Sequence, residues 1–457
     1  MPKSRGRAGA KRQRKPLSRP RAVGSVGPVL GDSADLLHAA VKGHMTASGG
    51  LPNGPGYRTG GTAVVVAAGQ PKTAGSVRSL PDRGLITGGS LGATSFNCDQ
   101  LSDTTPQSLG VTYWFDTATS GEPYKVSIRL AGKWLGRTEP HDGPHEPDGD
   151  KRTSFETIRT VDGIVPGTGR TAITTRMQGL ADGEWEITAS ATDNRHGSPT
   201  APPPDPPVHG AVLTTKARTS FSPVVNVRAP GARLGAWPTL VMSGAAVALM
   251  TQWFLSTKTG IPSLPILVLS LIACLIGLIG AKVYYLVTHR AERPPILTAG
   301  MCLQGFVIGA IATVLIASAV AGIPVGAVLD ATAPGLLFGM GIGRLGCFFG
   351  GCCVGRPSSS RWALWSSDRA IGTRRIPVQL IESSMSIAIG ITAFIAVAGA
   401  SPGPGGAVFL AAVAANTIGR QLLFPLRSLP RATAHGRPVT LLVSAIVLTA
   451  AVALVVL

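Results

Sequence analysis

Acidic residues are scarce in the second half of this 457-residue chain. From residue 235 to the C-terminus there are only four, which are Glu292, Asp330, Asp368 and Glu382. Apolar runs long enough to cross a lipid bilayer follow one another through the same region. The lack of acids therefore excludes a purely soluble protein and indicates a polytopic membrane protein with a polar N-terminal extension.

Acidic and aromatic residues are also missing from the first 21 residues, which hold nine lysines and arginines of a chain with net charge +19. A basic run can bind nucleic acid or anionic lipid headgroups, and the absence of aromatics for base stacking favours the membrane surface. We therefore expect no nucleic-acid partner. No apolar segment typical of a secretory signal follows the run. Residues 1–96 as a whole predict a mostly disordered basic tail, in which 62–67 is a candidate short strand.

Cysteine is rare, and five of the six cysteines lie in or beside apolar runs, so the chain carries no disulfide framework. Cys352 and Cys353 are adjacent, which is poor spacing for tetrahedral metal ligation, and no histidine is nearby. The simplest interpretation is that Cys347, Cys352 and Cys353 are small residues for helix packing, and no metal or cofactor is expected. A role for these thiols as carriers of acyl chains or in redox chemistry stays open.

Residues 97–232 show short segments that alternate between apolar and polar residues, separated by turn residues. The pattern predicts an all-β sandwich with strands at 110–115, 124–130, 154–158, 171–175 and 183–191, and a last strand at 221–227. The stretch from Leu180 to Ala189 resembles a late strand of immunoglobulin-like and fibronectin type III modules. This pattern does not identify the partner of the β-domain.

Residues 235–457 predict a helical membrane domain of about seven spans. The apolar runs lie at 238–256, 263–288, 297–321, 327–352, 381–399, 404–425 and 438–457. Arginines gather in the connections after the second, fourth and sixth spans. An odd number of spans places the β-domain on the face of these arginine-rich loops, and the positive-inside rule would make that face cytoplasmic.

The stretch from Gly343 to Arg356 places an arginine inside a predicted membrane helix. A charge near the middle of a bilayer costs at least about 2.5 kcal/mol, so Arg344 needs an anionic partner or a polar cavity. Together with Arg420 and Arg427 it suits recognition of a phosphate group. Asp330 and Glu382 would hold these arginines in place. Alternatively, Arg344–Asp330 and Arg420–Glu382 are ion pairs that only fix the helices to one another.

Read in order, the polar islands of the membrane domain resemble the motifs of the prolipoprotein diacylglyceryl transferase family. Gly343-Arg344-Leu345-Gly346-Cys347-Phe348 running on to Gly355-Arg356 is similar to its signature. The other matching segments are Gly300 to Gly305, Asp330 to Pro334, Pro377 to Glu382, and the pair Arg420 and Arg427. The resemblance covers about residues 235–457 and leaves the N-terminal half outside.

The resemblance implies an enzyme that moves the diacylglyceryl group of phosphatidylglycerol, or another anionic phospholipid, to the lipobox cysteine of a preprolipoprotein. It implies a phospholipid pocket in which Arg344, Arg420, Arg427, Gln379 and Asp330 bind the phosphate, with Gln304, Arg420 and Glu382 as catalytic residues. It also implies a multi-pass protein of the bacterial cytoplasmic membrane.

Five positions depart from the family pattern. They are Gln304 in place of His, Cys347 in place of Asn, Cys352 in place of Glu, Ile376 in place of His, and Phe424 in place of Glu. Glutamine cannot accept a proton near neutral pH, so a general base is missing at that position. The alternative function is therefore a catalytically inactive phospholipid-binding membrane protein whose β-domain recruits a partner. Orientation also stays open, because the family reacts on the extracytoplasmic side.

Overall fold

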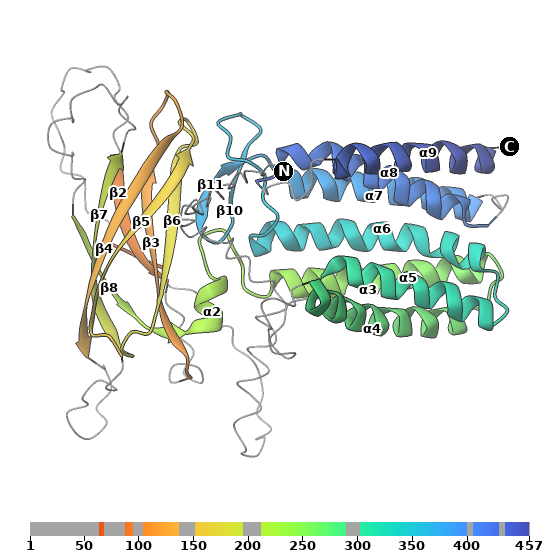
Figure 1. Cartoon of the computed structure of the whole chain (residues 1–457), viewed down its shortest axis with the longest axis horizontal. Coiled ribbons are helices and arrows are strands. Elements are labelled where there is room, and N and C mark those ends of the chain that lie inside the picture. The colour runs from red at the N-terminus through yellow and green to blue at the C-terminus, as the bar shows by residue number, and fades with distance from the viewer. Residues whose placement is uncertain are drawn as a thin grey trace, which may run out of the picture.

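The structure is a computed structural model that describes residues 64–67, 87–94, 104–136, 151–194, 212–288, 302–399, 405–428 and 435–456. A β-sandwich stands at one end of a bundle of long helices, and a hairpin from the helical part lies between them (Figure 1). Apart from two strands, the predicted disordered tail at 1–96 falls outside the described residues.

Two antiparallel sheets form the sandwich. The smaller contains β5 (Ser154–Ile164), β4 (Tyr124–Gly136), β7 (Glu184–Asn194) and β8 (Leu213–Arg218), in that order. The larger runs β1 (Val64–Ala67), β2 (Thr87–Thr94), β3 (Gln107–Asp116), β6 (Arg170–Gln178), β11 (Ile371–Arg375) and β10 (Leu364–Ser367), and β9 (Ser220–Phe221) pairs with β3. The five alternating segments predicted as strands are confirmed as β3 to β7.

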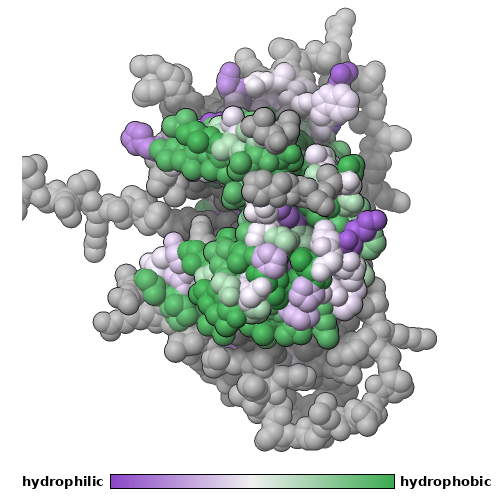
Figure 2. Space-filling model, turned by 90° about the vertical axis from the view of Figure 1, so that its right-hand side faces the viewer, coloured by the Kyte–Doolittle hydropathy of each residue, from purple (hydrophilic) through white to green (hydrophobic). Residues whose placement is uncertain are grey.

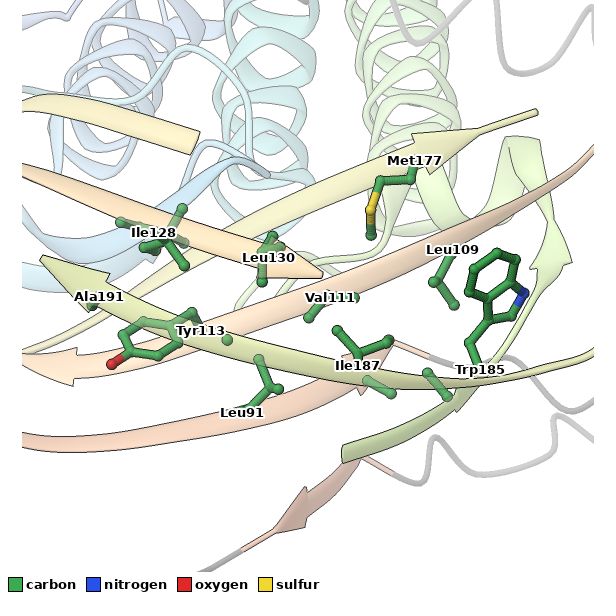
Figure 3. Packing of buried hydrophobic residues seen from close by; sticks show 14 of the residues in the cluster. Leu91, Leu109, Val111, Tyr113, Ile128, Leu130, Met177, Trp185, Ile187 and Ala191 are labelled. Carbon is green, nitrogen blue, oxygen red and sulfur yellow. The ribbon is translucent and has the colours of Figure 1, made fainter. Parts of the chain in front are cut away.

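Side chains that alternate inward along the strands fill the space between the sheets. Figure 3 shows Val111, Ile128, Leu130, Trp185 and Ile187 in this core, and each is at most 1% exposed. Burying side chains of this size contributes roughly 1.5–3 kcal/mol each, which offsets the cost of ordering the strands. The predicted strands are thus present in two packed sheets, one of which also contains β10 and β11, whereas likeness to immunoglobulin or fibronectin modules stays a prediction.

Two boundaries of the predicted β-domain differ from the structure. β1 and β2 lie before residue 97, so the sheet starts earlier than the alternating pattern indicates. The predicted last strand at 221–227 is wrong beyond Phe221, because Ser222–Val227 forms the short helix α2. Pro223 lies in the first turn of α2, where its missing N–H is not needed, and the three valines of the helix are buried.

Arg176 of β6 ties the sandwich to the linker and to the hairpin. Its guanidinium donates hydrogen bonds to the carbonyl oxygens of Val225, Arg228 and Arg369, at 2.8–2.9 Å. Burial, with the charge of Arg369 as a smaller cause, lowers the pKa of Arg176 to about 10. The side chain thus holds three separate segments together at the base of the sandwich.

The larger sheet passes directly into the membrane domain through β11. Ile371 and Gly372 of β11 pair with Ile173 and Ala172 of β6, and Trp365 of β10 stacks on Trp114 with ring centroids 5.7 Å apart. The loop after the fourth predicted span is therefore an ordered hairpin inside the sheet of the N-terminal domain. The β-domain lies on the same face as this arginine-bearing loop, as the odd number of spans predicts.

Seven helices form the membrane part of the described chain. They are α3 (Ala236–Lys258), α4 (Ser263–Thr288), α5 (Leu303–Val320), α6 (Val325–Gly350), α7 (Val378–Gly399), α8 (Ala407–Leu423) and α9 (Gly436–Val456). Six are long and apolar enough to cross a membrane, whereas the apolar part of α5, Gly305–Val320, is shorter. The prediction of seven spans is confirmed for six. Figure 2 shows the largely apolar surface at the end of the bundle away from the β-domain.

Small residues let α3 and α6 approach closely. A Cβ atom on Gly244 of α3 would lie only 2.7 Å from the carbonyl oxygen of Gly339 on α6, and one on Gly335 would lie 2.4 Å from that of Ala248. Helix association inside a bilayer depends on such close packing, since lipid tails are as apolar as leucine. α6 is thereby fixed in position along the bundle, and it carries Arg344.

Candidate functional site

The polar residues of the bundle gather at the end that faces the β-sandwich. α6 ends there, α7 begins there, and α8 ends there before a short 3₁₀ turn at Phe424–Leu426 (Figure 1). This arrangement brings Arg344, Glu382, Arg420 and Arg427 together. Four of the predicted site residues therefore share one place, although they are up to 83 positions apart in the sequence.

Glu382 is the anionic centre of this arginine site. It is 1% exposed, its Oε2 lies 2.9 Å from Nε of Arg344, and its Oε1 accepts a hydrogen bond from Nη2 of Arg427. The ion pairs predicted as a purely structural alternative, Arg344–Asp330 and Arg420–Glu382, are wrong, because neither is formed among the described residues and Glu382 pairs with Arg344 and Arg427. Both carboxylate oxygens are occupied by guanidinium groups, so the geometry assigns Glu382 to positioning the arginines.

Backbone pairing holds Arg427 beside Gly355 and Arg356, at the end of the stretch that begins at Gly343. Gly355 and Arg427 form an antiparallel bridge, and the amide of Arg356 donates to the carbonyl oxygen of Leu426 at 2.8 Å. The amide of Ser428 donates in turn to the carbonyl of Val354 at 3.1 Å. The Nε of Arg427 is buried and has no hydrogen-bond partner among the described residues.

Arg420 differs from the other two arginines. It is half-buried near the end of α8, and its charge interacts with those of Arg344, Glu382 and Arg427. Within the described chain it makes no hydrogen bond or ion pair of its own. One carboxylate thus faces three guanidinium groups, and the site keeps an excess of positive charge that suits an anionic ligand.

The structure describes the side chain of only one of the two glutamines predicted for the site. Gln379 is buried, and its Nε2 donates to the carbonyl oxygen of Cys352 at 3.0 Å, so it fixes the loop after α6. Gln304 is the second residue of α5, at the same end of the bundle, but its side chain lies outside the described residues. A role for Gln304 stays a prediction.

Asp330 is not brought to the arginines. It lies on α6 fourteen residues before Arg344, which is about 21 Å along the helix at about 1.5 Å per residue. Its carboxylate accepts hydrogen bonds from the amides of Gly406 at 2.7 Å and Phe409 at 2.9 Å. Gly406 is the N-cap residue of α8 and Phe409 lies in its first turn, so Asp330 caps the start of that helix. The predicted phosphate-binding role of Asp330 is therefore not consistent with its position.

Three cysteines form part of the site, which the spacing argument missed. The Sγ atoms of Cys347, Cys352 and Cys353 all lie within 4.8 Å of one another, and Nη1 of Arg344 lies 4.0 Å from Cys347 Sγ. The chain reverses after α6 because Gly351 takes a left-handed conformation, with φ 70°. The glycine after the end of the helix is the sequence signal that predicts this return.

Comparison with known proteins identifies the family of the membrane domain. The sequence model of prolipoprotein diacylglyceryl transferase matches residues 225–457, which is half of the chain and includes every site residue above. The chain belongs to the prolipoprotein diacylglyceryl transferase family. It is thus a multi-pass membrane protein of a transferase family in lipoprotein biosynthesis.

Individual relatives of the family are similar at low identity. The chain is 31% identical over 169 residues to phosphatidylglycerol–prolipoprotein diacylglyceryl transferase of Leifsonia xyli, covering 34% of this chain and 50% of the relative. It is 28% identical over 157 residues to the enzyme of the same name from Dehalococcoides mccartyi, and this match covers 32% of this chain and 60% of the relative. It is 35% identical over 99 residues to the enzyme of the same name from Bordetella avium, and this match covers 22% of this chain and 37% of the relative. The matches span about half the length of these relatives.

The departures from the family pattern lie around the arginines. Cys347 and Cys352, at the family's Asn and Glu positions, belong to the thiol cluster beside Arg344. Ile376 precedes α7, and its amide donates to the carbonyl oxygen of Arg356 at 3.1 Å. Phe424 lies in the turn between Arg420 and Arg427. The site thus combines three guanidinium groups with three thiols.

Proposed function

We propose that this protein transfers the diacylglyceryl group of phosphatidylglycerol, or another anionic phospholipid, to the thiol of a lipobox cysteine in a preprolipoprotein. The observation that carries the proposal is the cluster of Arg344, Arg420 and Arg427 around the single carboxylate of Glu382. Its surplus positive charge lies at the end of a bundle of membrane helices. A phospholipid headgroup is the anion that such a position meets.

The arginines have two tasks in this reaction. Forked hydrogen bonds from guanidinium groups bind the phosphate of the phospholipid and orient the glyceryl carbon that bears it. The acceptor thiolate attacks that carbon, the carbon–oxygen bond to phosphate breaks, and glycerol phosphate leaves with the electron pair. The same guanidinium groups stabilise the charge that develops on the leaving phosphate, which lowers the barrier.

Glu382 preorganises two of the arginines for substrate binding. Its two oxygens fix Arg344 and Arg427 in the absence of substrate, so fewer rotamers are lost when the lipid binds. Arg420, which has no such bond within the described chain, is the arginine most available to the phosphate. The named relatives are bacterial enzymes, and we place this protein in the bacterial cytoplasmic membrane as a multi-pass protein.

One observation favours a second function, a phospholipid-binding protein without transferase activity. The sheet of the β-domain continues through β11, and β11 is followed directly by α7 with Glu382. A partner bound to the β-domain would therefore sense the state of the lipid site. The Gln at position 304, in place of a general base, agrees with such a binding role.

Two measurements on the purified full-length protein separate these functions. Phosphatidylglycerol and a lipobox peptide are supplied, and release of glycerol phosphate is followed together with lipid binding. The transferase proposal predicts release by the wild type and loss of both release and tight lipid binding in Arg344→Ala. Lipid binding without any release by the wild type would contradict the transferase and support the second function.

A further inference from the structure

The three thiols of the site, on Cys347, Cys352 and Cys353, lie close together. Their Sγ atoms all lie within 4.8 Å of one another. In a tetrahedral zinc site with zinc–sulfur distances of about 2.3 Å, the sulfur atoms are roughly 3.8 Å apart. Small rotations of the side chains therefore bring the three sulfur atoms to the distances that a zinc ion requires.

The backbone around the cluster is prepared for this arrangement. Gly351 turns the chain in a left-handed conformation, and the amide of Cys352 donates to the carbonyl of Cys347 at 3.0 Å. Cys353 has φ 52°, which is unfavourable for a residue with a side chain and is typical of functional sites. Gln379 holds the carbonyl of Cys352 from the opposite helix. These contacts direct the thiols toward one point.

Positive charge borders the thiol cluster. Nη1 of Arg344 lies 4.0 Å from Cys347 Sγ. Three arginines and one glutamate leave two positive charges in excess, whereas three thiolates with one divalent cation carry a single negative charge. The arginines thus balance a metal–thiolate cluster and still leave positive charge for a phosphate.

We infer that Cys347, Cys352 and Cys353 bind a thiophilic divalent cation, for which Zn²⁺ is the natural candidate, and that its fourth coordination position is open. Soft thiolate ligands select such cations. Three protein ligands with one open position are typical of catalytic zinc sites, whereas structural sites are closed. No fourth cysteine, histidine or free carboxylate joins the cluster within the described residues.

A cation bound at this site activates the acceptor thiol at its open coordination position. That role rests on the proposed transferase function. A thiol that coordinates zinc is deprotonated outright, and its proton passes to solvent. The bound acceptor thiolate attacks the glyceryl carbon of the phospholipid, a sulfur–carbon bond forms, and the carbon–oxygen bond to phosphate breaks. Glycerol phosphate leaves with the electron pair. The neutral thioether product is a weak ligand and leaves the metal.

A metal ion at the thiol cluster would also replace the histidine bases that are missing from this chain. Gln304 and Ile376 stand where related enzymes have histidines, and neither can take a proton from a thiol. Metal coordination makes such a base unnecessary. The cysteines at positions 347 and 352 therefore represent a change of mechanism at the place where the acid–base groups are lost.

Metal binding is tested directly on the full-length protein purified under reducing conditions without chelators. We expect about one zinc per chain by elemental analysis, and thiolate-to-metal charge-transfer absorption when Cd²⁺ replaces zinc. Cys352→Ser and Cys353→Ser lose both signals, whereas Cys274→Ser on the exposed surface of α4 retains them. Circular dichroism confirms that each variant is folded. Equal metal content in wild type, Cys352→Ser and Cys353→Ser would overturn the site, as would wild type that binds neither metal.

Transfer assays then distinguish metal binding by the cysteines from activation of the acceptor thiol by the bound metal. Metal bound through the cysteines, together with glycerol phosphate release that stops on chelation and returns with Zn²⁺, supports both. Release that continues in metal-free protein would overturn the activating role and leave the transferase proposal intact. Metal bound through the cysteines without any release by the wild type would retain the site and contradict the transferase proposal.

Discussion

Arg344 of α6 and Glu382 of α7 form a buried ion pair, with Nε and Oε2 2.9 Å apart. The pair joins the two helices on either side of the β10–β11 hairpin, and the second oxygen of Glu382 binds Arg427 after α8. One carboxylate therefore links three segments of the membrane domain. Its environment explains how a membrane helix tolerates an arginine, because the guanidinium meets an acid and not lipid tails.

Replacing Glu382 by Gln removes this link and leaves two buried guanidinium groups without their counter-charge. We expect the free energy of unfolding to fall by about 3–5 kcal/mol, because breaking a buried pair leaves uncompensated charge. Thermal unfolding in detergent measures this loss. Glu156→Gln, at the exposed pair with Arg129, is the matched control and leaves the midpoint unchanged. Equal midpoints for both variants would contradict a central role for Glu382.

Arg420→Gln separates lipid binding from stability. Arg420 makes no ion pair within the described chain, so its loss leaves the unfolding midpoint unchanged, while affinity for phosphatidylglycerol falls about tenfold or more. Arg420→Lys keeps the charge without the forked geometry, so we expect its affinity for phosphatidylglycerol to lie between those of wild type and Arg420→Gln. Binding of lipid to purified protein is measured by native mass spectrometry. Lys258→Gln, exposed at the far end of α3, serves as control and binds like wild type.

Asp330→Ala tests the capping role of that residue. The amides of Gly406 and Phe409 lose the carboxylate that accepts their hydrogen bonds, and we expect a loss of about 2 kcal/mol in the free energy of unfolding. The arginine site is about 21 Å away, so lipid affinity of the folded protein is unchanged. Thermal unfolding and native mass spectrometry report the two quantities. A drop in lipid affinity equal to that of Arg420→Gln would restore Asp330 to the phosphate site.

Trp365→Ala tests the docking of the β-domain on the hairpin. Its ring stacks on Trp114, and its Nε1 donates to the carbonyl oxygen of Arg170 at 2.9 Å. Without these contacts we expect faster hydrogen exchange in β6 and β11, at the edge where the two parts of the chain pair. Trp362 is 73% exposed, and Trp362→Ala is the control that leaves exchange unchanged. Unaltered exchange in Trp365→Ala would show that the stack does not hold the two parts together.

Much of the fold is predictable from the sequence because it rests on local patterns. Period-two alternation locates β3 to β7, and apolar runs locate the helices to within a few residues. The hairpin at β10 and β11 was not predicted, because its strands are short and pair with a domain almost two hundred residues away. α2 was mistaken for a strand because Val224, Val225 and Val227 are β-branched, whereas packing against β3 and β6 decides its structure.

The site was predictable in its members more than in its pairings. Charges inside apolar runs identify Arg344, Glu382 and Arg420, since each needs a partner within the membrane, and Arg427 follows the sixth run by two residues. Which acid meets which arginine depends on the position along each helix, and Asp330 lies at the wrong end of α6 for Arg344. The thiol cluster does not follow from the spacing of its cysteines alone, and Gly351 directly after α6 is the sequence signal for the left-handed turn that returns Cys352 and Cys353 to Cys347.

The most direct test of the central claim is a product balance for a single reaction mixture. Purified wild-type protein is incubated with phosphatidylglycerol and a lipobox peptide, and both the diacylglyceryl-peptide and glycerol phosphate are quantified by mass spectrometry. We predict equimolar formation of the two products by wild type and none by Arg344→Gln. Formation of neither product by folded wild-type protein that binds phosphatidylglycerol would contradict the account.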